Sequence, residues 1–165
     1  RTHDSMTKTD APKPANQKRL KKSAARLYAV QALFQMEHSA LTIDKIIIEF
    51  EDQRFGEDFD EYAMREGDID TFRALLEGAV KGQRDIDQMT DRALVDNWPL
   101  GRIDPTIRAA FRAAGAELLA KQTPPKVIIT EFVDVVKAFF PETKEPKFVN
   151  AVLDAMARDA RPDAF

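Results

Sequence analysis

The sequence predicts an all-α fold of about seven helices. Apolar residues recur at three- and four-residue steps from Leu20 to Met156, which is the period of a helix with one buried face. No segment shows the alternation or the turn residues of a β-hairpin. A chain of 165 residues, 44% of them hydrophobic, suits one core. We expect a disordered arm over residues 1–16, a helical domain over 17–160 and a short tail over 161–165.

Two helices are predicted before residue 51. The first runs from about Lys18 to His38, and its apolar stripe consists of Leu20, Ala24, Leu27, Val30 and Phe34. The second is capped by either Thr42 or Asp44, because short polar side chains accept hydrogen bonds at helix N-termini. Its inward side chains are Ile46, Ile47 and Phe50. Residues 51–67 are acidic and contain two glycines, so we expect mostly loop there.

The next helical segment begins at Asp68, which is a suitable N-cap. Its apolar face consists of Phe72, Leu75, Leu76, Ala79 and Val80. Gly78 and Gly82, four residues apart, indicate close helix packing or a helix end. Helical spacing continues through Ile86, Met89, Ala93 and Leu94 and stops before Trp98.

Three helices are predicted in the C-terminal part. Asp104 followed by Pro105 is a strong helix start, and the buried side comprises Ile107, Ala110, Phe111, Ala114 and Leu118. Thr123 is a plausible cap for the next helix, which buries Ile128, Phe132, Val135 and Phe139. A loop between Pro141 and Pro146 precedes the last helix, with Phe148, Val149, Val152, Leu153 and Met156 on its apolar face.

The net charge of -3 conceals an uneven distribution. Residues 1–26 hold eight basic and two acidic residues, a charge of +6, which leaves -9 on the remainder. A basic segment on an acidic body suggests a polyanionic partner. The alternative is a solvated tail that only keeps the protein soluble, and charge alone does not decide between them.

Several classes of chemistry are excluded by composition. The chain has no cysteine and two histidines, His3 and His38, and it holds none of the common nucleotide, zinc-protease or hydrolase motifs. We therefore expect no metal, no cofactor and no catalysis. Glu131 and Asp134, three residues apart, are interpreted as a solvated helix face. Glu117, in an apolar helix, is interpreted as a hydrogen-bonded structural carboxylate.

Membrane association and secretion are not expected either. No apolar run approaches the roughly 20 residues that a membrane span needs, and the N-terminus has no apolar signal core. The absence of cysteine fits a reducing compartment, so we expect the protein in the cytoplasm without a membrane partner.

A cluster of basic residues opens the first predicted helix. Lys18, Lys22 and Arg26 follow each other at four-residue steps, with Arg19 and Lys21 beside them. Cations in the first turns of a helix oppose its dipole, so helix stability does not explain them. Binding to a phosphate backbone would explain these basic residues. Proteins that bind membrane surfaces or calmodulin-type partners also use basic amphipathic helices.

Six segments, in order, resemble the NusB family of transcription antitermination factors over about residues 18–158. They are residues 23–36 (SAARLYAVQALFQM), 72–80 (FRALLEGAV), 97–100 (NWPL), the helix over 104–118, 125–129 (PKVII) and 147–154 (KFVNAVLD). Four positions depart from the family pattern. Phe34 and Ala116 stand where tyrosine is usual, Thr130 where asparagine is usual and Ala151 where glycine is usual.

The resemblance implies a helical bundle of two packed subdomains. It also implies binding of boxA RNA together with NusE, a small-subunit ribosomal protein, in an antitermination complex on RNA polymerase. The RNA-binding residues carried over are Lys18, Arg19, Lys21, Lys22, Arg26, Lys147 and Phe148. A lysine beside an aromatic ring suits this task, because the ring stacks an unpaired base while the cation meets a phosphate. Without the resemblance, Phe148 would be assigned to the core.

The predicted NusE-binding residues are Phe34, Asp104 and Arg108. Phe34 also fits the core stripe and Asp104 also fits a helix cap, and a homodimer is compatible with the sequence. Two alternatives remain. One is a helical interaction module whose basic segment only aids solubility. The other is the NusB-like module of RNA cytosine methyltransferases, whose separate catalytic domain we do not expect within 165 residues.

Overall fold

The computed structural model describes residues 14–52, 68–94 and 99–165, and in these ranges the regular secondary structure is helical, with no strand. The elements are α2 (Pro14–Glu37), α3 (Ile43–Phe50), α4 (Ile69–Lys81), α5 (Gln83–Ala93), η3 (Leu100–Arg102), α6 (Pro105–Ala120), α7 (Pro125–Phe139), α8 (Glu145–Ala160) and η4 (Pro162–Ala164). The predicted all-α class is confirmed. Most of the predicted arm, residues 53–67 of the predicted acidic loop (51–67) and the Asn97–Trp98 pair lie outside the described residues, whereas residues 51 and 52 continue the helical conformation of α3.

Helix starts follow the local signals in three of four cases. The side chains of Thr42, Asp68 and Asp104 each accept a hydrogen bond from a backbone N–H two or three residues on. The prediction for Thr123 is wrong, because Pro124 is the N-cap of α7 and no side chain caps this helix. Successive prolines fix the backbone there and remove N–H groups that would need a partner. Helix α2 begins at Pro14, four residues before its predicted start.

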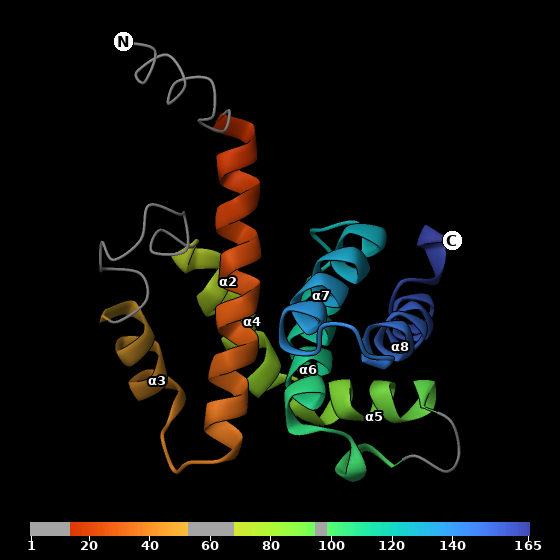
Figure 1. Cartoon of the computed structure of the whole chain (residues 1–165), viewed down its shortest axis with the longest axis horizontal. Helices are drawn as coiled ribbons and strands as arrows, with labels where there is room; N and C mark the ends of the chain where they lie inside the picture. The colour runs from red at the N-terminus through yellow and green to blue at the C-terminus, as the bar shows by residue number, and fades with distance from the viewer. Residues whose placement is uncertain (1–13, 53–67, 95–98) are drawn as a thin grey trace.

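The helices form two packed groups that share one core (Figure 1). Helix α2 stands between α3 and the second group, and α4 crosses behind α2 to pack against both α2 and α6. Helices α5 to α8 form the second group, and α6 packs against α2 and α4 as well as against α5, α7 and α8. The two subdomains that the sequence predicted are therefore joined through α6.

The buried stripe of α2 differs from the predicted one at both ends. Tyr28, Ala25 and Val30 are buried, but Leu20 is 40% exposed and Phe34 is 38% exposed. Leu20 is exposed because the first turns of α2 extend past the other described helices (Figure 1). Val80 and Phe139, also predicted to face the core, are exposed as well.

Small residues let α4 and α5 approach α6 closely. A Cβ placed on Gly78 would lie 3.2 Å from Cβ of Ala116, and one on Gly115 would lie 2.5 Å from Cγ2 of Ile86. Gly78 therefore marks close packing, as the sequence suggested, whereas Gly82 is the residue that ends α4. The helices around α6 owe their close spacing to these positions.

Gly115→Ala is expected to lower the free energy of unfolding by about 1–3 kcal/mol, because overpacking forces Ile86 and the backbone apart. The better helix propensity of alanine offsets up to about 1 kcal/mol of this effect. Urea unfolding checks the value. Gly101→Ala is the matched control, since nothing lies within 4 Å of a Cβ there. Equal effects of the two changes would contradict the packing argument.

Candidate nucleic-acid interface

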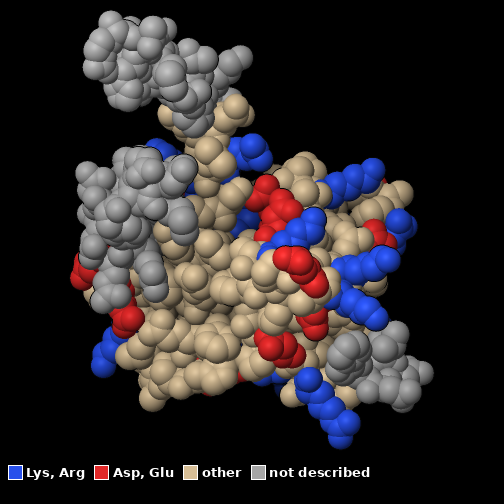
Figure 2. Space-filling view, viewed as in Figure 1, with Lys and Arg blue, Asp and Glu red and all other residues tan. Residues whose placement is uncertain are grey.

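The predicted basic cluster lies on the projecting turns of α2. Lys18 and Arg19 are exposed, and Lys21 and Lys22 are partly exposed. Basic side chains flank this part of the helix in the space-filling view (Figure 2). Four of the five predicted cations of the first helix are thus accessible to a polyanion.

Lys22 also borders a small hollow of about 200 Å³ between α2, α4 and α6. Ala116 lines this hollow at the position where the family pattern has tyrosine. Because Ala116 is 7% exposed and in close contact with Gly78, its small side chain also permits the approach of α4 to α6. This departure from the family pattern therefore lies beneath the basic turns.

Arg26 does not share the surface of the other cations. It is 4% exposed, and its Nε and Nη2 donate to the two carboxylate oxygens of Glu117 at 2.9 and 2.7 Å. Its Nη1 lies 3.2 Å from Oε1 of Glu131. Burial by itself lowers the pKa of Arg26, but the hydrogen bonds and charges of Glu117 and Glu131 outweigh it and raise the pKa above its usual value. Because the charge of Arg26 is paired with buried carboxylates, Arg26 does not belong to the RNA surface that the sequence predicted.

Of the two carboxylates around Arg26, the prediction for Glu117 is confirmed and the one for Glu131 is wrong. Glu117 is a hydrogen-bonded structural carboxylate, as predicted. Glu131 is not part of a solvated face, because it accepts hydrogen bonds from Ser23 Oγ at 2.6 Å and from Arg26. Asp134 is exposed, as expected. The spacing of Glu131 from Ile128 and Val135 places it at the edge of the apolar face, a signal that could have indicated its burial.

Lys147 and Phe148 lie at the start of α8. Lys147 is exposed and borders a groove of about 620 Å³ between the end of α7 and the start of α8, together with Lys137 and Asn150, which the sequence did not single out. Phe148 is half-buried, with its ring edge toward Phe111 at a centroid distance of 6.2 Å. Part of the Phe148 ring is therefore packed in the core, and the rest is accessible at the surface.

The predicted RNA residues therefore form two groups. The basic turns of α2 border the hollow against α4 and α6, whereas Lys147 borders the groove of α7 and α8. The hollow and the groove share no lining residue. A ligand that contacts both must be long enough to cross the surface between them, as a strand of nucleic acid is.

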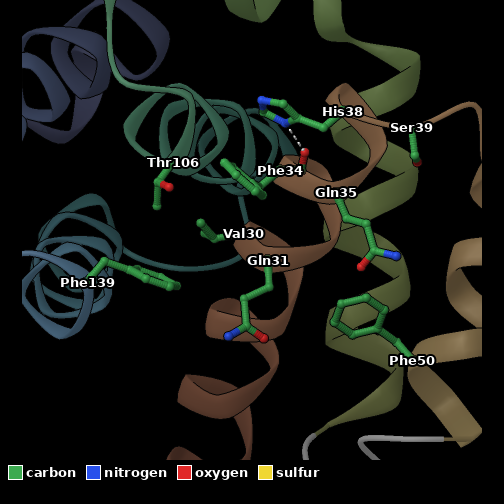
Figure 3. A pocket seen from close by; sticks show the side chains of 9 residues that line it. All are labelled: Val30, Gln31, Phe34, Gln35, His38, Ser39, Phe50, Thr106 and Phe139. Carbon is green, nitrogen blue, oxygen red and sulfur yellow. Dashed lines mark hydrogen bonds between the residues drawn. The ribbon is translucent and has the colours of Figure 1, made fainter.

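Phe34 opens onto a different, uncharged surface. It lines a hollow of about 390 Å³, and none of the lining residues is an acid, a lysine or an arginine. They are Val30, Gln31, Phe34, Gln35, His38, Ser39, Phe50, Thr106 and Phe139 (Figure 3). The rings of Phe34 and His38 lie 4.4 Å apart, and Nδ1 of His38 is 2.8 Å from the carbonyl oxygen of Phe34. Few charges appear over the C-terminal half of α2 in Figure 2.

The other two predicted partner residues have structural roles. Asp104 is exposed but caps α6, as the alternative expectation held. Arg108 binds both carboxylate oxygens of Glu37, at 2.8 and 2.5 Å, and donates to the carbonyl oxygens of Leu100 and Ile103. The hydrogen bond from Arg108 holds the pKa of Glu37 below its usual value. Most donors of Arg108 are thus engaged within the protein.

The remaining features of the described part of the chain concern membrane spans and metal-binding clusters. Of the helices in the described ranges, none combines the length and the apolar character of a membrane span. Within the same part of the chain, no group of three or more acidic or histidine side chains is placed to hold a metal ion.

Comparisons with known proteins agree on one family. The sequence model of the NusB family matches residues 23–158. The chain is 45% identical over 157 residues to the transcription antitermination protein NusB of Sinorhizobium fredii, covering 94% of this chain and 97% of that protein. It is 47% identical over 151 residues to the protein of the same name from Maricaulis maris, covering 91% and 93%.

Solved structures show the same fold. The chain superposes on NusB of T. maritima with a TM-score of 0.68 and 30% identity, over 87% of this chain and 96% of that one. A chain from the crystal structure of the antitermination factors NusB and NusE with dsRNA has a TM-score of 0.68 and 24% identity, covering 84% and 97%. The sequence match and the fold lead to one conclusion: this chain belongs to the NusB family.

Proposed function

We propose that this chain is a transcription antitermination factor that binds boxA-type RNA together with a NusE-like ribosomal protein in a complex with RNA polymerase. The observation that carries the proposal is the exposed basic cluster on the projecting turns of α2. It is supported by the name that the relatives with more than 40% identity share. The protein acts by binding, without catalysis of its own.

The proposed RNA surface has two parts with different chemistry. Lys18, Arg19 and the neighbouring Lys21 and Lys22 neutralise phosphates, and this attraction is independent of base sequence and sensitive to salt. Lys147 and the exposed part of Phe148 supply a second contact, in which the ring stacks an unpaired base. RNA that crosses from α2 to the start of α8 would use both parts.

The proposed surface for the NusE-like partner is the uncharged hollow beside Phe34. The exposed rings of Phe34 and Phe139 offer apolar area, and Gln31 and Thr106 offer hydrogen-bonding groups. This combination is typical of protein interfaces. The ion pair of Arg108 on α6 with Glu37 at the end of α2 joins two of the helices that line the hollow. A second copy of this chain is the alternative occupant of the hollow.

Retention of labelled boxA RNA by the purified protein, with and without a NusE-like partner, tests the function. We expect the two proteins together to retain more RNA than either alone, and more boxA RNA than a scrambled RNA of equal length. If the partner leaves retention unchanged, joint recognition is wrong. If no RNA is retained in low salt by any combination, the RNA-binding function is wrong.

The two kinds of RNA contact are expected to fail differently. Lys22→Ala should weaken binding to all RNAs and reduce the salt slope by roughly one phosphate contact. Phe148→Leu should cost up to about 1–3 kcal/mol of binding through lost stacking and leave the salt slope intact. Leucine keeps apolar volume against Phe111, and a thermal melt checks that the fold is kept. Equal salt slopes for the two variants would contradict this division.

A further inference from the structure

Three helices meet around the guanidinium of Arg26. Glu117 from α6 holds it bidentately, and Glu131 from α7 binds it from a second direction. Glu131 also accepts a hydrogen bond from Ser23, one turn earlier on the same face of α2. Ser23 and Arg26 are thus two points at which α7 holds α2 from one side.

This network lies directly below the projecting basic turns. Arg26 is one helical turn beyond Lys22, and the carbonyl oxygen of Lys21 accepts a hydrogen bond from the backbone N–H of Asp68 at 3.0 Å. Lys18 and Arg19 lie farther out on the same helix (Figure 1). A rotation of α2 at Arg26 would therefore swing the outer cations around the helix axis.

The charges of the network do not favour RNA binding by themselves. Two carboxylates surround one guanidinium, so an excess negative charge lies close to a surface that is to meet phosphates. Stability is a weak explanation as well, because a buried ion pair often contributes little compared with apolar residues of the same volume. The planar guanidinium does, however, fix the geometry of the groups that bind it.

We propose that Glu131, through Arg26 and Ser23, is a positioning residue that fixes the rotation of α2 and so directs Lys18, Arg19 and Lys22 toward RNA. The inference rests on the proposed RNA-binding function. It assigns to an acidic residue a favourable effect on the binding of a polyanion. That sign is opposite to the one expected from charge alone.

Glu131→Ala and Asp134→Ala test the sign directly. Both remove one negative charge from α7, and Asp134 is exposed. Charge alone predicts equal or tighter RNA binding by both variants. If Glu131 positions α2, Glu131→Ala lowers the affinity for boxA RNA by about three- to ten-fold, as when one phosphate contact is lost. Asp134→Ala leaves the affinity unchanged or slightly higher, and Glu131→Gln, which keeps an acceptor for Ser23 and Arg26, retains most of it.

The orientation of α2 can also be measured without RNA. The chain has no cysteine, so Gln17→Cys on α2 and Lys126→Cys on α7 take two unique spin labels. Both positions are exposed. Glu131→Ala should broaden or shift the distance distribution between the labels, whereas Asp134→Ala should not. A thermal melt of each labelled variant identifies any global loss of folding.

The outcomes separate the two proposals. If the unaltered protein does not bind RNA, the proposed function fails, and the spin-label distances still show whether Glu131 holds α2. If the unaltered protein binds RNA but Glu131→Ala binds as tightly as Asp134→Ala, the positioning role is overturned while the function stands. An unchanged distance distribution in Glu131→Ala also overturns it.

Discussion

Replacing Arg26 with leucine is expected to lower the free energy of unfolding by about 3–5 kcal/mol, because Glu117 is left buried without its cation. Leucine supplies apolar volume but no hydrogen-bond donor for either carboxylate. Urea unfolding near neutral pH measures the loss.

Arg92→Leu is the matched control for this loss. Arg92 pairs with Asp159 at 2.8 Å, but its side chain is 59% exposed. An exposed ion pair contributes at most about 1 kcal/mol, so this change should be nearly neutral. A similarly small effect of Arg26→Leu would show that the carboxylates around Arg26 find water or other partners. The buried network would then not be needed for the stability of the fold.

The double charge reversal Lys18→Glu/Lys22→Glu is expected to lower the affinity for boxA RNA by about 100-fold or more in low salt, through lost phosphate contacts and new repulsion. The difference should narrow as salt is added, because exposed charges are screened. Fluorescence anisotropy with labelled RNA over a series of salt concentrations measures both effects.

Lys45→Glu/Lys81→Glu produces the same change in net charge away from α2. Both lysines are exposed, on α3 and at the end of α4. If binding depends on the local cluster, this control weakens it far less. Equal losses in the two double variants would show that RNA responds only to total charge, and the assignment of a surface to α2 would be wrong.

The sequence predicted those features that depend on neighbours along the chain. Asp104 and Pro105 marked the start of α6 because both act within the first turn of the helix. Arg26 shows where this approach stops. It continues the four-residue path of Lys18 and Lys22, yet its partners Glu117 and Glu131 lie 91 and 105 residues away.

Exposure on α2 was difficult to predict for a related reason. A helix that packs against neighbours on two sides buries more than one stripe of residues. The spacing of apolar residues alone therefore does not tell which of its faces is buried and which is exposed. Tyr28 was therefore missed as a core residue, and Phe34 was taken for one. The hollow beside Phe34 combines residues from four helices, α2, α3, α6 and α7, which no local pattern brings together.

Helix α6 is buried on nearly every side, from Ile107 to Leu118. A helix with so little polar surface has no stable place in water by itself, so it keeps its conformation only while both groups of helices surround it. Neither group can lose its packing without uncovering apolar surface that belongs equally to the other. The two subdomains are therefore a single thermodynamic unit, which folds and unfolds in one cooperative step.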